Sequence, residues 1–153
     1  ISQILAGRQE RTEQVEACPP DRVRIEAAVE KYPSIEYAFD IHRDGLSASE
    51  KNTKIYQTSV SGASCAKIMM VMGTTPKNAE ANISFAQSVQ EKMNQMYPGL
   101  FKNTLKRPYK YNQEVVAKSV LFELGSNLST PEEAKTSAVF LGRVLGELIG
   151  EKK

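Results

Sequence analysis

Apolar positions recur three and four residues apart in three stretches of the 153-residue chain. This spacing gathers the apolar side chains on one stripe of a helix, so each stretch is predicted to be a helix with one face against a core. At the start of the last one, Thr130, Pro131 and Glu133 supply the N-cap, the first-turn proline and the capping box. Its inward stripe is predicted to hold Ala134, Ala138, Leu141, Leu145 and Leu148. The predicted helices cover residues 19–32, 78–96 and 131–148.

Other stretches have the patterns of strands. Residues 35–42 alternate apolar and polar side chains before the turn at Asp44-Gly45, which predicts a strand with one buried face. Residues 68–72 and 119–125 are almost continuously apolar and run into glycines, which predicts buried strands. A weaker strand over residues 52–60 is expected to pair with residues 68–72 through a hairpin at the turn-like SGAS.

The order of these elements predicts the fold class. Helix, strand, hairpin, helix, strand and helix indicate a single α/β domain over residues 1–153, layered around a central, mostly parallel sheet flanked by helices. Residues 1–17 have mixed charge and only a weak apolar stripe. Residues 100–114, LFKNTLKRPYKYNQE, are predicted to form a basic, aromatic loop longer than most connections, and therefore a functional or mobile segment.

Composition narrows the classes of partner. The 20 Lys and Arg residues nearly balance 18 Asp and Glu residues and form no basic stripe, so no nucleic-acid partner is expected. No apolar run approaches the roughly 18 residues that span a bilayer. Cys18 and Cys65 have no metal-type spacing, and they would form a disulfide only in an oxidising compartment. The chain begins at Ile1 rather than Met, which we interpret as a processed or partial chain.

Two polar residues fall at the carboxyl ends of predicted strands: His42, the chain's only histidine, and Glu123, within VLFEL. Ligands of open α/β sheets bind at such strand ends. A carboxylate in an apolar strand is either paired or used, because burial without a partner is costly and raises its pKa toward that of a general base. The structural alternative is that Glu123 pairs with a cation such as Arg43, while His42 hydrogen-bonds Asp40 or Asp44.

Four segments in the order KYPSIEYAFDIHRD, YPGLF, YNQE and LFELGSNLSTPEEA resemble the stage II sporulation protein P family, over most of residues 21–149. Members of that family resemble zinc-dependent N-acetylmuramoyl-L-alanine amidases, which cut the bond between muramic acid and the stem peptide. The resemblance implies a sporulation peptidoglycan hydrolase outside the cytoplasmic membrane. It also implies a membrane anchor upstream of this chain and a partner protein that cleaves glycan strands.

The resemblance implies roles for the residues at the strand ends. In such amidases, two histidines and a glutamate hold a zinc ion that polarises the amide carbonyl and lowers the pKa of a bound water, and a second glutamate assists the attack. His42 matches the family's downstream zinc histidine, and Glu123 matches the catalytic glutamate. Asp40 or Asp44 is expected to hold the second ring nitrogen of His42. Arg43 is expected to steady a substrate carboxylate or to form a structural salt bridge.

The sequence departs from the family pattern upstream of these residues. No histidine precedes His42, and none of Glu10, Glu13 and Glu16 sits in a recognisable ligand context. One explanation is that the first strand and its zinc ligands lie upstream of Ile1, which would leave a sheet edge exposed. A second is a degenerate homologue that binds peptidoglycan or a partner without cleavage. A third, an α/β domain unrelated to cell wall chemistry, requires the resemblance to be accidental.

Overall fold

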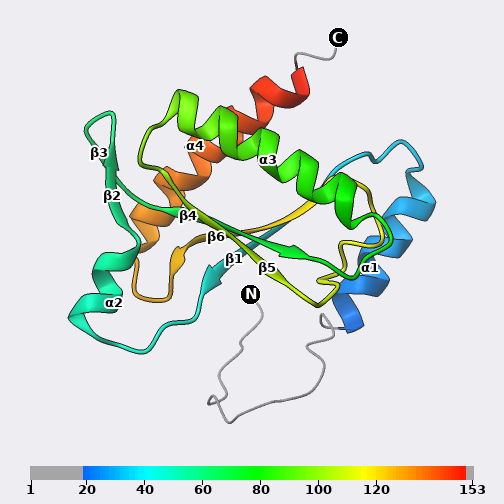
Figure 1. Ribbon diagram of the computed structural model, residues 1–153, viewed down its shortest axis with the longest axis horizontal. Coiled ribbons are helices and arrows are strands. Elements are labelled where there is room, and N and C mark those ends of the chain that lie inside the picture. Colours follow the sequence, from blue (N-terminus) through cyan, green and yellow to red (C-terminus); the bar gives the residue numbers. More distant parts are fainter. Residues whose placement is uncertain (1–18, 151–153) are drawn as a thin grey trace.

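A computed structural model of the chain describes residues 19–150 (Figure 1). Its central sheet contains the strands β1 (Ala38–Asp44), β4 (Ile68–Gly73), β5 (Phe101–Arg107) and β6 (Ser119–Ser126). Their order across the sheet is β1-β6-β4-β5. β1 is parallel to β6, β4 is antiparallel to β6, and β5 is parallel to β4. The predicted α/β fold with a mostly parallel central sheet is therefore confirmed.

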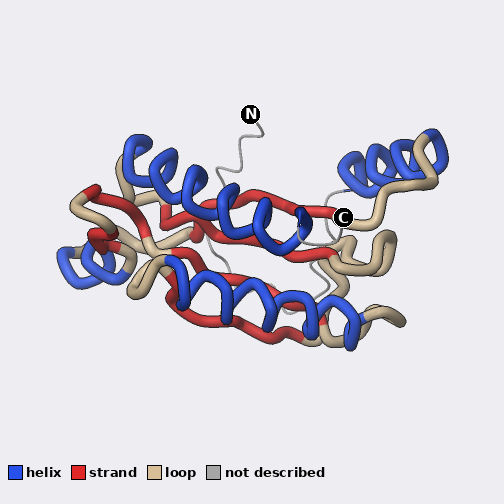
Figure 2. The backbone as a smooth tube through the Cα atoms, turned by 90° about the horizontal axis from the view of Figure 1, so that it is seen from above, coloured by secondary structure: helices blue, strands red, loops and turns tan. Residues whose placement is uncertain are grey.

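Two long helices, α3 (Ala79–Met96) and α4 (Pro131–Gly150), lie side by side over one face of this sheet (Figures 1 and 2). Successive side chains of a strand point to opposite faces, so alternate residues of β4 and β6 meet the helices. No helix within residues 19–150 is both long and apolar enough to span a membrane. The main core between helices and sheet includes Ile68, Met70, Met72, Val89, Met93, Val120, Phe122, Phe140, Leu141 and Val144.

The start of α4 confirms the predicted capping box. The Thr130 N–H donates to Glu133 Oε2 at 2.8 Å, and the Glu133 N–H donates to Thr130 Oγ1 at 3.2 Å. The inward stripe differs from the prediction: Leu141 is buried as predicted and Ala138 is exposed. Ser137, Phe140 and Val144 are also buried. Ser137 Oγ donates to the Ala66 carbonyl at 2.6 Å and accepts from the Ala66 N–H at 2.9 Å. A polar residue faces the core here because its hydroxyl is hydrogen-bonded.

The prediction of a strand over residues 52–60 is wrong in its first half. Residues 50–55 form a short helix, α2 (Glu50–Ile55). The side chain of its N-cap Ser49 accepts a hydrogen bond from the Asn52 N–H at 3.1 Å. A serine in this place stabilises the first turn of a helix, and that local contact outweighs the weak alternation of the segment.

The predicted hairpin exists but joins different strands. It pairs β2 (Gln57–Val60) with β3 (Ala63–Ala66) in a separate two-stranded sheet. Its turn residues Ser61 and Gly62 have φ angles of 51° and 78°, the positive values that a two-residue hairpin turn needs. Every residue of β4 is buried, so this strand lies inside the central sheet rather than in the hairpin.

The loop predicted for residues 100–114 is wrong in its first half, because residues 101–107 form β5. Polar side chains such as Lys102 and Asn103 interrupt the apolar pattern that would predict this strand. β5 is an edge strand, paired within residues 19–150 only with β4, so these side chains need not enter the core. At the opposite edge, β1 pairs only with β6 among the described strands, and Ile41 is 53% exposed.

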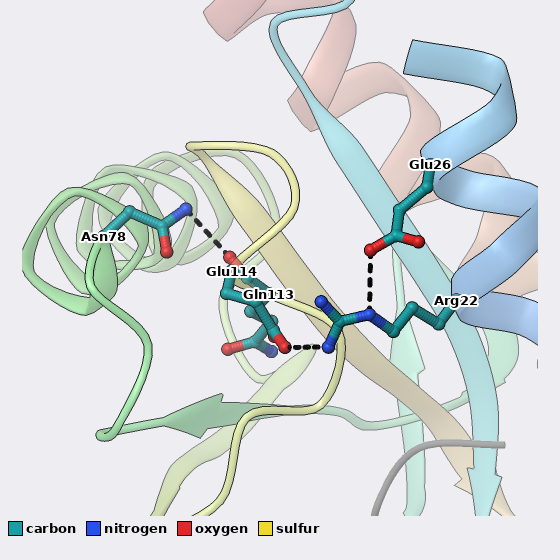
Figure 3. A network of polar contacts seen from close by, with 5 residues as sticks. All are labelled: Arg22, Glu26, Asn78, Gln113 and Glu114. Atoms are coloured by element: carbon teal, nitrogen blue, oxygen red, sulfur yellow. Dashed lines mark hydrogen bonds and ion pairs between the residues drawn. The ribbon is translucent and has the colours of Figure 1, made fainter. Parts of the chain in front are cut away.

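The second half of the segment 100–114 is held in place by the buried side chain of Gln113. Gln113 Oε1 accepts from the Gly73 N–H, and Gln113 Nε2 donates to the Val71 carbonyl, both at 2.9 Å. The side-chain amides of Asn78 and Asn82 both donate to the Gln113 carbonyl at 2.9 Å, and Figure 3 shows the first of these bonds. The segment is thus anchored to the end of β4 and the start of α3.

We expect Gln113→Ala to lower the free energy of unfolding by about 2–4 kcal/mol, because it leaves the buried backbone groups of Gly73 and Val71 without partners. Chemical denaturation measures the loss. Gln87→Ala, on the exposed side of α3, is the matched control and should change stability by less than about 0.5 kcal/mol. Equal stability of the two variants would contradict the anchoring role.

Helix α1 (Pro19–Lys31) lies apart from α3 and α4, at one end of the sheet (Figure 1). The face predicted from Ile25, Ala28 and Val29 is half-buried. Arg22 forms ion pairs with Glu26 at 2.8 Å and with Glu114 at 2.7 Å (Figure 3). The second pair joins α1 to the segment that follows β5.

Candidate functional site

The sheet brings His42 and Glu123 together. β1 and β6 are neighbouring parallel strands, and His42 lies opposite Glu123 in their register. Paired residues of neighbouring strands point to the same face, here the face opposite to α3 and α4. On this face lies a smaller buried cluster of Tyr56, Met69, Val71 and Leu121.

Asp40 and Asp44 flank His42 on β1, each two residues away. Asp40 Oδ1 lies 2.7 Å from His42 Nε2, and both side chains are about half exposed. Asp44 Oδ2 accepts a hydrogen bond of 2.8 Å from the hydroxyl of Tyr56, a fully buried residue. Burial and the contact with Asp44 raise the pKa of Tyr56, so this hydroxyl keeps its proton. The contact of His42 with Asp40 agrees with the structural alternative, in which His42 only hydrogen-bonds a neighbouring aspartate. It also agrees with a metal site, because a carboxylate commonly orients a metal-binding histidine.

Glu123 carries the most perturbed carboxyl group of this face. It is partly buried, and its Oε2 is buried without a hydrogen bond from any described residue. Burial raises the pKa of Glu123 from 4.5 to about 7; His42 opposes the shift, and the charges of Asp44 and Asp40 add to it. A carboxyl group with this pKa exists in both protonation states near neutral pH, as a general acid and base must.

An ion pair between Arg43 and Glu123, which the structural alternative predicts, is not present among the described contacts. Arg43 Nη2 donates to the carbonyl oxygen of Ser126 at 2.6 Å and also to that of Ser129. These bonds tie β1 to the turn after β6, so Arg43 has a structural role. Its binding of a substrate carboxylate stays a prediction that these contacts do not favour.

The described residues do not complete a zinc site. Within residues 19–150, no three His, Cys, Asp or Glu side chains gather in a group able to hold a metal ion. Cys65 is buried as a free thiol whose pKa is raised by burial. The roles of His42 as zinc ligand and Glu123 as base stay predictions. The upstream residues considered above, Glu10, Glu13, Glu16 and Cys18, lie outside the described residues.

Two cavities lie near the ends of the central strands. One of about 270 Å³ lies between α1 and the starts of β1 and β6, and Asp40 is among its lining residues. Another, of about 560 Å³, lies beyond the ends of β4 and β5 and is lined in part by Arg22, Lys77 and Glu114. Because β4 is antiparallel to β6, that larger cavity lies at the opposite end of the strands from His42 and Glu123. Neither of these two cavities is lined by His42 or Glu123.

Two residues near the site carried little signal in the sequence. Tyr56 lies against Asp44 and Met69, although the sequence gives it the pattern of an ordinary strand residue. The Lys102 ammonium lies 4.9 Å from the centre of the Tyr56 ring. The one sequence signal for Lys102 was its place in the basic, aromatic stretch at residues 100–114, and that stretch was predicted to be a loop.

The raised pKa of Glu123 predicts a pH dependence of stability. The folded state holds a proton on Glu123 up to about pH 7, whereas the unfolded chain releases it near pH 4.5. Protonation therefore favours the folded state, and this contribution to the free energy of unfolding falls as pH rises from about 4.5 to about 7. Glu123→Gln should remove this slope and be more stable than the wild type above about pH 7, by roughly 1–2 kcal/mol after allowance for solvent screening. Denaturation curves at several pH values test it; parallel curves for both proteins would contradict the shift.

Comparisons with known proteins show to which proteins the chain is similar. The profile of the Stage II sporulation protein P (SpoIIP) family matches residues 20–146. The chain is 28% identical over 129 residues to the stage II sporulation protein P of Bacillus subtilis (strain 168), a match covering 81% of this chain and 31% of the relative. The chain thus spans about a third of the length of that relative.

Solved structures share the fold at low identity. The N-acetylmuramoyl-L-alanine amidase AmiC2 of Nostoc punctiforme has a TM-score of 0.53 at 12% identity, covering 84% of this chain and 65% of that one. The N-acetylmuramoyl-L-alanine amidase of Clostridium difficile 630 has a TM-score of 0.51 at 14% identity, covering 94% of this chain and 71% of that one. These likenesses show a shared fold. The family profile spans most of the sequence and confirms the predicted resemblance: the chain belongs to the stage II sporulation protein P family.

Proposed function

We propose that this protein is a peptidoglycan hydrolase of sporulation that cuts the amide between muramic acid and the stem peptide. The observation that carries the proposal is the pairing of His42 with Glu123, a carboxyl group of pKa about 7, near the carboxyl ends of two parallel strands. Family membership and a fold shared with amidases support the same reaction class.

Glu123 has the properties of the proton carrier in this reaction. In its charged form it takes a proton from the water that attacks the amide carbonyl, and in its protonated form it gives that proton to the leaving nitrogen. Burial and the charges of Asp40 and Asp44 keep both forms populated near neutral pH. The second carboxylate oxygen, Oε2, is an acceptor that no described side chain occupies.

We also propose that His42 is one ligand of a zinc ion, together with ligands outside residues 19–150. The contact of its ring with Asp40 supports this role, because metal-binding histidines are commonly oriented by a carboxylate. The described residues do not complete the site. The proton transfer proposed for Glu123 is argued from the burial of Glu123 and the charges around it, and not from a bound zinc ion.

A second candidate function is peptidoglycan or partner binding without cleavage. The observation that favours it is the lack, within residues 19–150, of a group of three side chains able to hold a metal. A degenerate homologue would keep the sheet and the strand ends while lacking the other zinc ligands.

Family membership also supports proposals about partner and location. We propose that the protein acts with a second protein that cleaves glycan strands, outside the cytoplasmic membrane. Its anchor would be a membrane segment that is not in this chain.

Incubation with purified peptidoglycan in zinc-containing buffer tests the proposed function. Amide cleavage releases new amino groups from the stem peptides and creates no new reducing ends on the glycan. Pelleting with the peptidoglycan without release of either group would support the second candidate. If the protein neither releases amino groups nor pellets with the peptidoglycan, both functions are contradicted.

A further inference from the structure

A row of residues crosses all four strands of the central sheet at the level of the candidate site. His42 of β1 lies opposite Glu123 of β6, and Glu123 lies opposite Met69 of β4. The register between β4 and β5 is irregular at this same level: Phe101 faces the residue before Met69, and Thr104 faces the residue after it. Lys102 and Asn103 fall within the irregularity, a feature that re-aims side chains and is common beside active sites.

The ammonium group of Lys102 is held on the same face of the sheet as Glu123. Its Nζ lies 3.7 Å from Met69 Sδ, donates to Asn103 Oδ1 at 3.0 Å, and lies 4.9 Å from the Tyr56 ring centre. The Tyr56 hydroxyl in turn touches Met69 Sδ at 3.6 Å and donates to Asp44. Lys102 is therefore joined to the candidate site through Met69 and Tyr56.

Lys102 has no carboxylate partner within residues 19–150. Its contacts are a thioether, an amide oxygen and an aromatic face, which orient a cation but leave its charge without a counter-ion. A partly buried ammonium group in such surroundings loses hydration without gaining an ion pair. An anionic group of a bound ligand would supply the missing charge.

We propose that Lys102 binds a carboxylate of the stem peptide and makes the protein specific for peptides that carry one. This inference rests on the proposed function. The Lys102 ammonium lies against Met69 of β4, the residue opposite Glu123, so the recognised carboxylate lies close to the scissile amide in the stem peptide.

The test compares two soluble muramoyl-peptides, one with free peptide carboxylates and one with the same groups amidated. For the wild type we expect kcat/KM to be at least about tenfold higher on the free-carboxylate peptide, mainly through KM. Lys102→Met keeps the apolar stem and removes the charge, and it should reduce this ratio to within about twofold. Lys102→Arg should recover part of the ratio. Lys106→Met, on the exposed end of the same strand, is the matched control and should retain it.

A ratio in Lys102→Met equal to that of the wild type, including a variant that loses both activities equally, would overturn the proposal. Failure of the wild type to cleave either peptide would overturn the proposed function instead. Equilibrium binding of the same two peptides still decides the role of Lys102 in that case. Tighter binding of the free-carboxylate peptide by the wild type, lost in Lys102→Met, supports the proposal; equal binding of both peptides by the wild type overturns it.

Discussion

Glu123→Gln is expected to lower muramoyl-amide cleavage by about 10²–10⁴-fold, because it removes the group that accepts and returns the proton. Glutamine has nearly the same shape, so β6 should keep its pairing with β1 and β4. The measurement is the release of stem-peptide amino groups from peptidoglycan at about pH 7.5, together with zinc content.

Glu91→Gln, on an exposed position of α3, provides the matched control and should leave cleavage unchanged. Unchanged zinc binding in Glu123→Gln would separate loss of the base from loss of a ligand. For the wild type, cleavage should rise with pH up to about pH 7, as Glu123 changes to its charged form. Undiminished cleavage by Glu123→Gln would rule out its role as the base.

The second large effect is expected in zinc content. After loading with Zn²⁺ and removal of the excess, the full-length protein, including any residues upstream of Ile1, should retain about one zinc per molecule. His42→Ala should lose it, because structural and catalytic zinc sites need each of their three or four ligands. Elemental analysis of the purified proteins gives the stoichiometry.

Asp40→Asn adds a graded control to this experiment. Loss of the carboxylate that contacts His42 should weaken zinc binding by about 10–100-fold without abolishing it. A wild-type protein that retains no zinc would make His42 a structural residue at a strand end, and peptidoglycan binding without cleavage would then be the better account.

Local patterns predicted much of the fold. The stripes of α3 and α4 and the capping box at Thr130 and Glu133 depend on residues a few positions apart, so they are readable without any partner segment. The same holds for β6, whose apolar run forms one of the buried strands of the sheet. The two polar residues of the candidate site were found because each interrupts a strand pattern.

Pairing between strands was not readable in this way. Residues 68–72 have the same apolar pattern whether they join the hairpin or the central sheet, and contacts with distant strands decide between them. β5 was missed because an edge strand tolerates polar side chains. Arg43 has the residue type of an ion-pair partner, but the turn after β6 offers it backbone carbonyls instead.

Local periodicity and residue type are enough to predict the helices, most strands, the family resemblance and the two candidate residues His42 and Glu123. Only the tertiary structure decided that Glu123 lies between His42 and Met69, and that Lys102 reaches the same face of the sheet. The pKa of Glu123 also belongs to the tertiary structure, because burial and the charges of neighbouring strands set it. Such contacts join segments far apart in the chain, and no local pattern encodes them.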